Sequence, residues 1–373
     1  MKIYLVGGAV RDELLGRSVS ERDWVVVGAN PEKLLQLGYQ PVGKDFPVFL
    51  HPKTHEEYAL ARIERKTGAG YTGFACYFSE EVTLEEDLKR RDLTINAMAK
   101  SESGEIIDPY GGQADLRDRV LRHVSSAFVE DPVRILRVAR FAARFGDFHV
   151  HSDTVALMTA MRQTNELDAL VAERVWRELE RAIEEPFPLQ FFSVLQSCQA
   201  MAKLFPELGT ISDNANPHNH FAALARAVEL SAEGPVRFAA LLHDLAQASI
   251  KKLSKRLHIP VIYHGLAQLV AGWCVDYGRL PTLDAAYWLQ LLENTDAFRR
   301  PQRFQQFLLA CAATLPDSKI AMTYNQSLEA ALQLAKKIDI APLLASGLSG
   351  QALGEALSRA RKAVIADYLL TDK

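Results

Sequence analysis

The chain has 373 residues, of which 48% are apolar and 24% charged, and its formal net charge is −3. This length predicts about two or three domains of ordinary globular composition, and no apolar run is long enough to cross a membrane. Because the charge balance is slightly negative, no overall positive field attracts a polyanion, so any contact with nucleic acid must come from local clusters. The four cysteines lie far apart without metal-ligand spacing, which predicts reduced thiols and a cytoplasmic protein.

The first 115 or so residues alternate short apolar runs with turn signals, a pattern that predicts a small mixed sheet with helices on one side. The candidate strands are Ile3–Val6, Trp24–Val27, Val48–Leu50, Tyr58–Ala61 and Glu105–Ile107. Helices are expected at Ala9–Leu15, Pro31–Leu37 and Asp92–Met98. Segment 66–73 has three glycines in eight residues and is predicted to be a loop.

From about residue 113 onward, strand signals nearly vanish and apolar residues take helical spacing. The predicted helices are Glu130–Arg144, Asp153–Arg162, Ala172–Glu184, Ala222–Leu230, Val236–Leu245, Ala285–Leu292 and Ser327–Lys337. Breaks are expected at Pro186–Pro188, Gly209–Pro217 and Gly278–Pro281. The fold class is therefore α+β, with a mixed-sheet head over 1–122, a helical neck over 123–210 and an all-helical body and tail over 211–373.

Two glycines follow the first apolar run and open a short helix that carries an arginine: Gly7, Gly8 and Arg11. Glycine lets the backbone approach phosphate groups closely, and the amides at a helix start favour anionic oxygens. Glu21 and Asp23 stand at the head of the next apolar run, and residues two apart in a strand project from one face. Such a pair suits Mg²⁺ that bridges nucleotide phosphates, so this unit predicts phosphoryl or nucleotidyl transfer.

Further polar groups accompany this unit in the first 115 residues. Glu57 is either a third carboxylate from a neighbouring strand or an ordinary surface acid. Within Lys89–Met98, Arg91 offers a phosphate donor and Asp92 an acceptor for ribose hydroxyls, although Asp92 is also suited to cap a helix that begins there. Asp108–Gly112 has the composition of a turn.

An arginine cluster without lysine lies between residues 117 and 144, at positions Arg117, Arg119, Arg122, Arg134, Arg137, Arg140 and Arg144. Arginine favours planar, bidentate contact with phosphates or base edges. Arg134, Arg137 and Arg140 adjoin on one helix flank, which is a solvated basic face unless it meets a ligand. Asp131 lies three residues before Arg134, so a carboxylate and a guanidinium can point at one place and complement the edge of a base.

A His-Asp pair, His243 and Asp244, falls on a predicted apolar helix. Such a pair either satisfies itself internally or binds a metal ion. His220 upstream and Asp296 downstream would complete a ligand set for Mg²⁺, Mn²⁺ or Ni²⁺.

As a group, these motifs resemble the class II CCA-adding enzymes (tRNA nucleotidyltransferases) of bacteria, within the DNA polymerase beta superfamily. The resemblance is closest to the gammaproteobacterial multifunctional subgroup, which appends an HD phosphohydrolase domain. It covers the first 200 residues closely and the remainder loosely. It implies a DNA polymerase beta-like head, followed by a helical body with an HD-type domain.

The resemblance also implies roles for the matching residues. Gly7, Gly8 and Arg11 would cradle the incoming triphosphate, and Glu21 and Asp23 would hold two catalytic metal ions. The other site residues so implied are Glu57 near the metals, Arg91 and Asp92 for the ribose, Asp131 and Arg134 as the protein template that reads CTP and then ATP, and Arg137 and Arg140 as nucleotide contacts. Segment 66–73 matches a flexible loop needed to switch from C to A addition, which argues against an enzyme that adds only CC.

Two positions depart from the family pattern. The first metal carboxylate is normally Asp and is Glu21 here, one methylene longer, so the expectation is retained chemistry with altered metal affinity. After His243 and Asp244 the expected lysine is missing, and only His258 and His264 remain of the histidine cluster. The HD-type domain is therefore expected to be degenerate, serving as a structural and tRNA-binding body.

The predicted function is stepwise addition of C, C and A to tRNA 3′ ends from CTP and ATP, by Mg²⁺-dependent two-metal chemistry. The helical body is expected to bind the tRNA acceptor arm by recognising the shape and the sugar-phosphate backbone of the RNA. Three alternatives stay open: a bacterial poly(A) polymerase, an HD-type phosphohydrolase using Ni²⁺ or another divalent ion, and a non-catalytic RNA-binding protein. The mild tail Ala360–Lys373 speaks against the first, because poly(A) polymerases of this type carry a longer, strongly basic tail.

Overall fold

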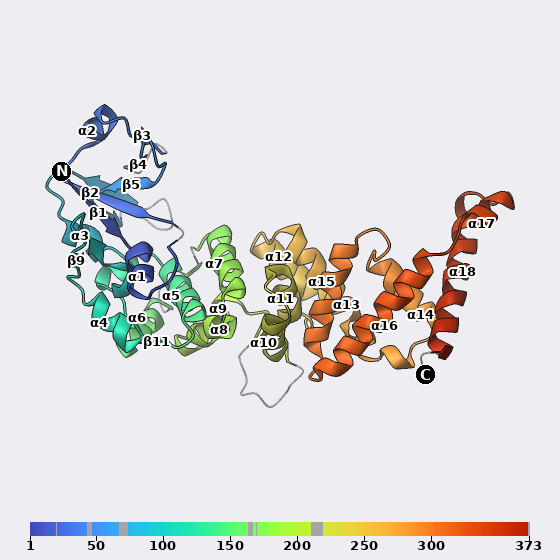
Figure 1. Cartoon of the computed structure of the whole chain (residues 1–373). Helices are drawn as coiled ribbons and strands as arrows, with labels where there is room; N and C mark the ends of the chain where they lie inside the picture. Colours follow the sequence, from blue (N-terminus) through green and yellow to red (C-terminus); the bar gives the residue numbers. More distant parts are fainter. Residues whose placement is uncertain are drawn as a thin grey trace. The chain divides into compact units, whose positions relative to one another are not determined.

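The computed structural model describes residues 1–19, 21–42, 47–66, 74–162, 167–168, 170–209 and 219–371. The chain divides into two compact units, Met1–Pro206 and Glu207–Lys373 (Figure 1). The boundary lies near the one predicted at 210, and the predicted head and neck belong to a single unit. No helix in the described part of the chain is long and apolar enough to span a bilayer.

The first unit is built on a seven-stranded sheet with strand order β3-β4-β5-β2-β1-β8-β9 (Figure 1). These strands are β1 (Lys2–Val6), β2 (Asp23–Val27), β3 (Gln40–Pro41), β4 (Val48–Leu50), β5 (Glu57–Leu60), β8 (Ala99–Lys100) and β9 (Ile106–Ile107). A separate hairpin pairs β6 (Arg62–Lys66) with β7 (Phe74–Phe78). The helices of this part are α1 (Gly8–Leu14), α2 (Pro31–Gln36), α3 (Leu84–Lys89) and α4 (Gly112–Asp118).

Strand β2 lies at the centre of the sheet, antiparallel to β1 and parallel to β5. Its successive side chains enter two different cores: Val25 packs with Val6 and Leu88, whereas Val26 packs with Leu34. Because apolar cores cover both faces, the strand is held rigidly. In the pairing register Asp23 lies opposite Glu57, so the parallel pair brings two acids from distant parts of the sequence to neighbouring strand starts.

The strand predictions for this unit are confirmed, but the predicted helix Asp92–Met98 is wrong. The structure has a single 3-10 turn there, η1 (Thr94–Asn96), and the α-helix lies upstream as α3, opened by a capping box between Thr83 and Glu86. The Asp92 carboxylate accepts from the Leu93 amide (2.8 Å), while the Thr94 amide donates to the carbonyl of Arg122 (2.9 Å). These bonds replace the ladder of an α-helix, so Asp92 does not cap one.

Helices fill the remainder of the first unit, as predicted. They are η2 (Ser126–Glu130), α5 (Val133–Arg144), α6 (Ser152–Arg162), α7 (Ala172–Glu184), α8 (Pro188–Ser197) and α9 (Met201–Leu204), with a small parallel pair of β10 (Val120–Leu121) and β11 (His149–Val150). Helix α5 buries Ile135, Leu136 and Ala139 completely, and it packs against α7 and α8. The packing of its apolar side fixes α5 in place, and the arginines on its other flank line a cavity described below.

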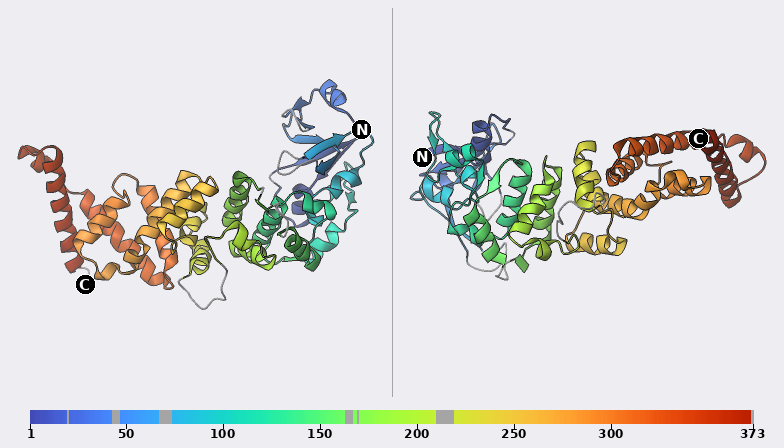
Figure 2. Two further views of the ribbon diagram at one scale, coloured as in Figure 1. Left: turned by 180° about the vertical axis from the view of Figure 1, so that it is seen from behind. Right: turned by 90° about the horizontal axis from the view of Figure 1, so that it is seen from below.

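The second unit is helical throughout its described residues (Figure 2). Its elements are α10 (His220–Leu230), α11 (Gly234–Leu241), α12 (Gln247–Arg256), α13 (Val261–Gly278), η4 (Leu280–Thr282), α14 (Ala285–Asn294), α15 (Pro301–Thr314), α16 (Ser318–Lys336), α17 (Ala341–Ala345) and α18 (Gly350–Thr371). Buried alanines Ala223, Ala240 and Ala313 form one cluster and let α10, α11 and α15 approach closely. Helix α11 ends at Leu241, four residues before its predicted end, so His243 and Asp244 follow the helix.

The predicted turn at Asp108–Gly112 is confirmed, and it generates a stability prediction. Asp108 accepts hydrogen bonds from the amides of Gly112 (2.7 Å) and Gln113 (2.8 Å), which caps α4. A Cβ atom on Gly112 would lie 2.4 Å from the carbonyl oxygen of Thr94. Gly112→Ala should therefore lower the free energy of unfolding by about 1–3 kcal/mol in a urea titration.

Arg117→Ala on the same helix is the matched control for this substitution. Its side chain is exposed, so its free energy of unfolding should stay within about 0.5 kcal/mol of that of the unmodified chain. Equal free energies of unfolding for the two variants would contradict the proposed steric conflict at Gly112.

Candidate active site

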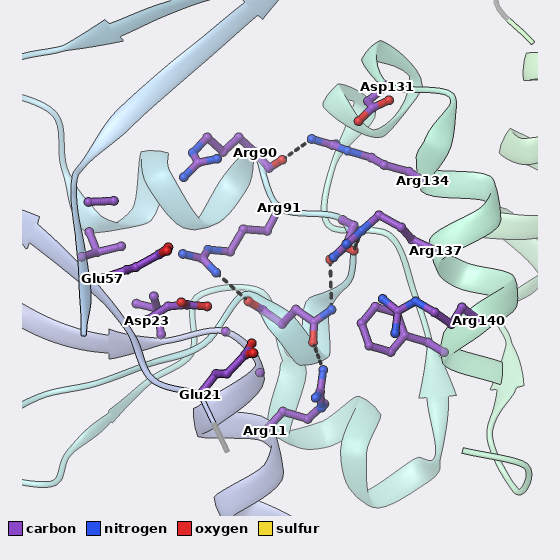
Figure 3. Close-up of a pocket in the computed structure, with 18 of the residues that line it drawn as sticks. Arg11, Glu21, Asp23, Glu57, Arg90, Arg91, Asp131, Arg134, Arg137 and Arg140 are labelled. Atoms are coloured by element: carbon purple, nitrogen blue, oxygen red, sulfur yellow. Dashed lines mark hydrogen bonds and ion pairs between the residues drawn. The ribbon is translucent and has the colours of Figure 1, made fainter. Parts of the chain in front are cut away.

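A cavity of about 610 Å³ opens in the first unit, between the sheet and helices α5 and α7 (Figure 3). All twelve residues that the sequence singled out for nucleotide and metal binding in the first unit line it: Gly7, Gly8, Arg11, Glu21, Asp23, Glu57, Arg91, Asp92, Asp131, Arg134, Arg137 and Arg140. Five further arginines line it as well: Arg62, Arg90, Arg144, Arg174 and Arg181. Ten guanidinium groups thus face five carboxylates, an excess of positive charge suited to a polyanion.

The turn between β1 and α1 forms one wall of this cavity. Gly7 has a φ of 72°, a backbone conformation that favours glycine, and its amide donates to the carbonyl of Met98 (3.2 Å). A Cβ atom at Gly7 would lie only 2.8 Å from Nη1 of Arg91. The missing side chain therefore lets the arginine lie directly against the turn.

Three acids lie together in the cavity beside this turn, since Asp23 pairs with Val6 of β1 (Figure 3). Asp23 begins β2 and Glu57 begins β5, whereas Glu21 lies two residues before the strand and is not part of it. Desolvation by the surrounding protein raises the pKa of Asp23, with a further increase from Glu21 that Arg91 opposes. A divalent cation would relieve this cost, since it favours the charged carboxylates.

Few side chains at this site could bind a metal ion. Within the described residues, no group of three or more His, Cys, Asp and Glu side chains is arranged to hold a metal ion. Mg²⁺ commonly takes one or two protein carboxylates and completes its shell with water and substrate phosphates. Glu21 and Asp23 fit that mode, whereas the structure does not place Glu57 in a three-carboxylate cage.

Asp92 lines the cavity, and the protein donates three hydrogen bonds to its carboxylate. It accepts hydrogen bonds from the Leu93 amide (2.8 Å), the Asn96 side chain (3.0 Å) and Nε of Arg137 (2.7 Å). Burial alone would raise its pKa, but Arg137 and these hydrogen bonds outweigh burial and hold the pKa far below its usual value. Asp92 is therefore ionised, and it fixes both Asn96 and Arg137.

Arg91 lies beside this group with donor capacity to spare. Its Nη2 lies 3.3 Å from Asp87 and its Nη1 3.5 Å from the carbonyl of Asn96, while its buried Nε has no hydrogen-bond partner among the described residues. Burial, which outweighs the Asp87 charge, lowers the pKa of Arg91. A guanidinium short of acceptors in a cavity is a ready partner for phosphate oxygens.

The start of α5 supplies the pair predicted to read a base. Arg134 donates to the carbonyl oxygens of Ala127 (2.9 Å) and Arg90, and Asp131 accepts from the Val133 amide (3.1 Å). Both side chains line the cavity, as predicted, and the Arg134 amide donates to the carbonyl of Asp131 (3.0 Å). The Asp131 carboxylate forms a bidentate ion pair with Arg174 of α7, at 3.1 and 2.7 Å.

The rest of the arginine flank is held by rings and buried acids. Arg140 lies 4.6 Å from the centre of the Phe141 ring and donates to Glu178 (2.6 Å). Arg11 lies 5.2 Å from the same ring, and Asp12 pairs with both Arg11 (2.9 Å) and Arg144 (3.0 Å). The cations are thus fixed in direction before any ligand arrives.

Several lining or supporting residues escaped the sequence prediction. Arg144 belonged to the arginine run, and Asn96 lay inside Lys89–Met98, so signals for both were present. Arg174 and Arg181 lie seven residues apart on α7, where charge spacing on the predicted helix would have indicated a common face. For Arg62 no local signal exists.

The predicted HD-type metal set is not assembled in the second unit. His220 Nδ1 lies 3.0 Å from Asp244 Oδ2, but His243 turns its Nδ1 to the carbonyl of Ala240 (2.8 Å). Asp296 pairs with Arg299 (2.7 Å) and Arg300 (3.1 Å), the residues that follow it in the sequence. These groups are all described, and they do not form a cluster of three metal-binding side chains. The expectation of a four-residue site is therefore corrected: of the four side chains, His220 and Asp244 are joined by a hydrogen bond, and Asp296 pairs with arginines instead.

Two protein-family models match parts of the chain. Residues 3–122 match the family described as Poly A polymerase head domain, and residues 147–211 match the family described as Probable RNA and SrmB-binding site of polymerase A. The first match spans the predicted head and the second falls on the helices that follow α5.

Curated relatives extend over nearly the whole chain. The CCA-adding enzyme of Pseudomonas putida (strain W619) is 51% identical over 371 residues, which covers 99% of this chain and 98% of that protein. The Multifunctional CCA protein of Nitrosococcus oceani is 48% identical over 407 positions and covers both chains completely. Because that alignment is longer than the 373 residues here, the Nitrosococcus protein contains segments without a counterpart in this chain.

Solved structures share the fold. The apo form II of a CCA-adding enzyme superposes with a TM-score of 0.75 at 24% identity, covering 100% of this chain and 91% of that one. The Thermotoga maritima CCA-adding enzyme complexed with tRNA_CCA gives a TM-score of 0.71 at 22% identity, covering 100% and 92%. The near-complete matches to curated CCA-adding enzymes define the chain as a nucleotidyltransferase. Because these relatives are 48% and 51% identical over nearly the whole chain, the chain belongs to the family of CCA-adding enzymes.

The His243 contacts generate a prediction for the second unit. His243→Ala should leave the number of Ni²⁺ or Mn²⁺ ions bound per chain unchanged in equilibrium dialysis, because the imidazole bonds a carbonyl within its own segment. The variant should lower the free energy of unfolding by about 1–3 kcal/mol, since His243 is buried. Loss of one bound ion per chain in His243→Ala, and likewise in Asp244→Asn, would contradict this account.

Proposed function

We propose that this chain adds C, C and A stepwise to the 3′ end of tRNA, using CTP and ATP and no nucleic-acid template. The observation that carries the proposal is the convergence of all twelve predicted residues on one arginine-rich cavity. The near-complete alignment with proteins named CCA-adding enzyme supports the same reaction. The reaction joins the tRNA 3′-hydroxyl oxygen to the α-phosphate and releases pyrophosphate.

Glu21 and Asp23 are the proposed holders of Mg²⁺, with Glu57 close by. When bound, the ions activate the 3′-hydroxyl and neutralise charge on the leaving pyrophosphate. The residues of the chain supply the positioning. The turn at Gly7 and Gly8 admits the triphosphate to close approach, and Arg91 offers donors to its oxygens.

The nucleoside is proposed to lie toward α5. The ionised carboxylate of Asp92 is an acceptor for ribose hydroxyls, and Arg137, held by Asp92, points into the same space. Asp131 offers an acceptor and Arg134 a donor to the base edge. Cytosine and adenine both present an amino group beside a ring nitrogen acceptor, so one protein edge complements both bases.

The second unit is proposed to contact the sugar-phosphate backbone of tRNA. Helix α12 exposes Lys251, Lys252 and Lys255, and such a row binds phosphates without reading sequence. Segment 66–73, predicted as the loop for the switch from C to A addition, lies almost entirely outside the described residues. That role therefore stays a proposal from sequence.

The decisive test supplies tRNA lacking its terminal CCA with CTP, ATP and Mg²⁺ and sequences the product ends. The proposal expects CCA and no longer tail. Extended A tails would instead indicate a poly(A) polymerase, which the family name of the head match keeps as a second candidate. Absence of any addition would indicate a non-catalytic RNA-binding protein.

Variants of the two acids test the metal assignment in the same assay. Asp23→Asn and Glu21→Ala should each reduce kcat by about a hundredfold or more, because each removes a metal ligand. Glu21→Asp, which restores the usual family residue, should stay within about tenfold of the unmodified chain. Unchanged rates in Glu21→Ala would show that the metal ions bind elsewhere.

The close contact at Gly7 gives a second prediction for nucleotide binding. Gly7→Ala should weaken CTP and ATP binding by about tenfold or more in calorimetry, because the new Cβ displaces Arg91. Gly16→Ala is the matched control: its φ is 66°, so the backbone strain is similar, but no atom lies within 4 Å of the new Cβ. Equal affinities for the two variants would mean that backbone strain, rather than displacement of Arg91, causes any effect.

A further inference from the structure

Two side chains of opposite charge, Arg174 and Glu178, lie on the face of α7 that packs against α5. Arg174 reaches Asp131 just before α5, and Glu178 accepts from Arg140 (2.6 Å) further along it. Residues four apart on a helix share a face, so both pairs form only in one register of α7 against α5. Val175 and Leu179 are buried beside them, which fixes the helix in that register.

The contact between Arg174 and Asp131 has the geometry of a clamp. Nη1 donates to Oδ1 (3.1 Å) and Nη2 to Oδ2 (2.7 Å), so the planes of the two groups are set together. The Val133 amide adds a third bond to Oδ1 (3.1 Å). A carboxylate has about four acceptor positions, so these three bonds leave one for a further donor. Asp131 itself has extended backbone angles, and the regular part of α5 does not orient its side chain.

Arg134 is held in the complementary way. Arg134 donates to the carbonyl oxygens of Ala127 and Arg90, the second of which Figure 3 draws, whereas Asp131 accepts from Arg174 and the Val133 amide. A base that contacts both groups must give a donor to Asp131 and take a donor from Arg134. Cytosine and adenine have that order on their pairing edges, and uracil and guanine have the reverse. The orientation of Asp131 therefore decides which bases fit.

We propose that Arg174 is a positioning residue for base selection, which holds Asp131 in the orientation that accepts the amino group of cytosine or adenine. The proposal rests on the proposed function, since it assigns a role within CCA addition. Arg174 acts through Asp131 and not on the base. A lysine at this position retains the charge but cannot form two parallel bonds, so charge and geometry are separable.

The test measures kcat/KM for CTP, ATP, UTP and GTP with the full chain and tRNA lacking its end. Arg174→Ala should lower the preference for CTP over UTP by about tenfold to a hundredfold, and Arg174→Lys should give an intermediate value. Arg177→Ala is the matched control, because Arg177 is exposed on the same helix and does not line the cavity. Its preference should equal that of the unmodified chain.

A double variant shows whether the effect passes through Asp131. Arg174→Ala combined with Asp131→Asn should discriminate no worse than Asp131→Asn alone, since the clamp then has nothing to orient. Circular dichroism and the unfolding midpoint identify a variant that fails to fold. In that case Arg174→Lys carries the comparison.

Two results would overturn the proposal. Unchanged CTP:UTP and ATP:GTP ratios in folded Arg174 variants would remove any selective role. An equal rise in KM for all four nucleotides would make Arg174 a phosphate contact instead. Failure of the unmodified chain to add CCA is a separate outcome, because it rejects the proposed function before any variant is compared.

Discussion

The first unit depends on a solution to one electrostatic problem, the crowding of guanidinium groups around a single cavity. Two unit charges about 6 Å apart repel by roughly 3 kcal/mol at an effective dielectric constant of about 20. Acids that do not line the cavity offset part of this repulsion: Asp12 holds Arg11 and Arg144, and Asp87 holds Arg90 and Arg91. The remaining positive excess faces the cavity, where a nucleoside triphosphate would neutralise it.

The choice of arginine over lysine follows from the same problem. A guanidinium is flat, so it can lie on a ring while its edge still donates hydrogen bonds. Phe141 has Arg11, Arg137 and Arg140 within 5.8 Å of its ring centre, and Phe145 has Arg11, Arg17 and Arg144 within 5.6 Å. The rings separate the cations without consuming their N–H groups. A lysine ammonium, as a hydrated point charge, cannot be arranged in this way.

The sequence predicted what local chemistry determines. The apolar run Trp24–Val27 predicted the central strand, the bounds predicted for Ala172–Glu184 are those of α7, and the motif residues converge on one cavity. The failures involve partners far away in the chain. The helix predicted from Asp92 was lost to the bond between Thr94 and Arg122, and the partner of Asp131 is 43 residues away. Periodicity does not contain such pairings, because they arise only when elements pack.

Two aspartates that line the cavity, Asp92 and Asp23, differ in how far the protein stabilises their ionised forms. Asp92 has three donors from the protein, and its pKa is held far below the usual value, so this pairing stabilises the folded state above the unfolded pKa of about 3.9 and is lost as pH falls toward the folded value. Asp23 has the opposite balance: burial and Glu21 raise its pKa against the opposing charge of Arg91, so its ionised form is destabilised in the absence of a cation. The protein itself stabilises the charge of Asp92, whose carboxylate keeps about one acceptor position for the proposed ribose contact. The ionised carboxylate of Asp23 stays destabilised in the folded protein. A divalent ion would remove this destabilisation, and the free energy so recovered would contribute to the affinity for the ion.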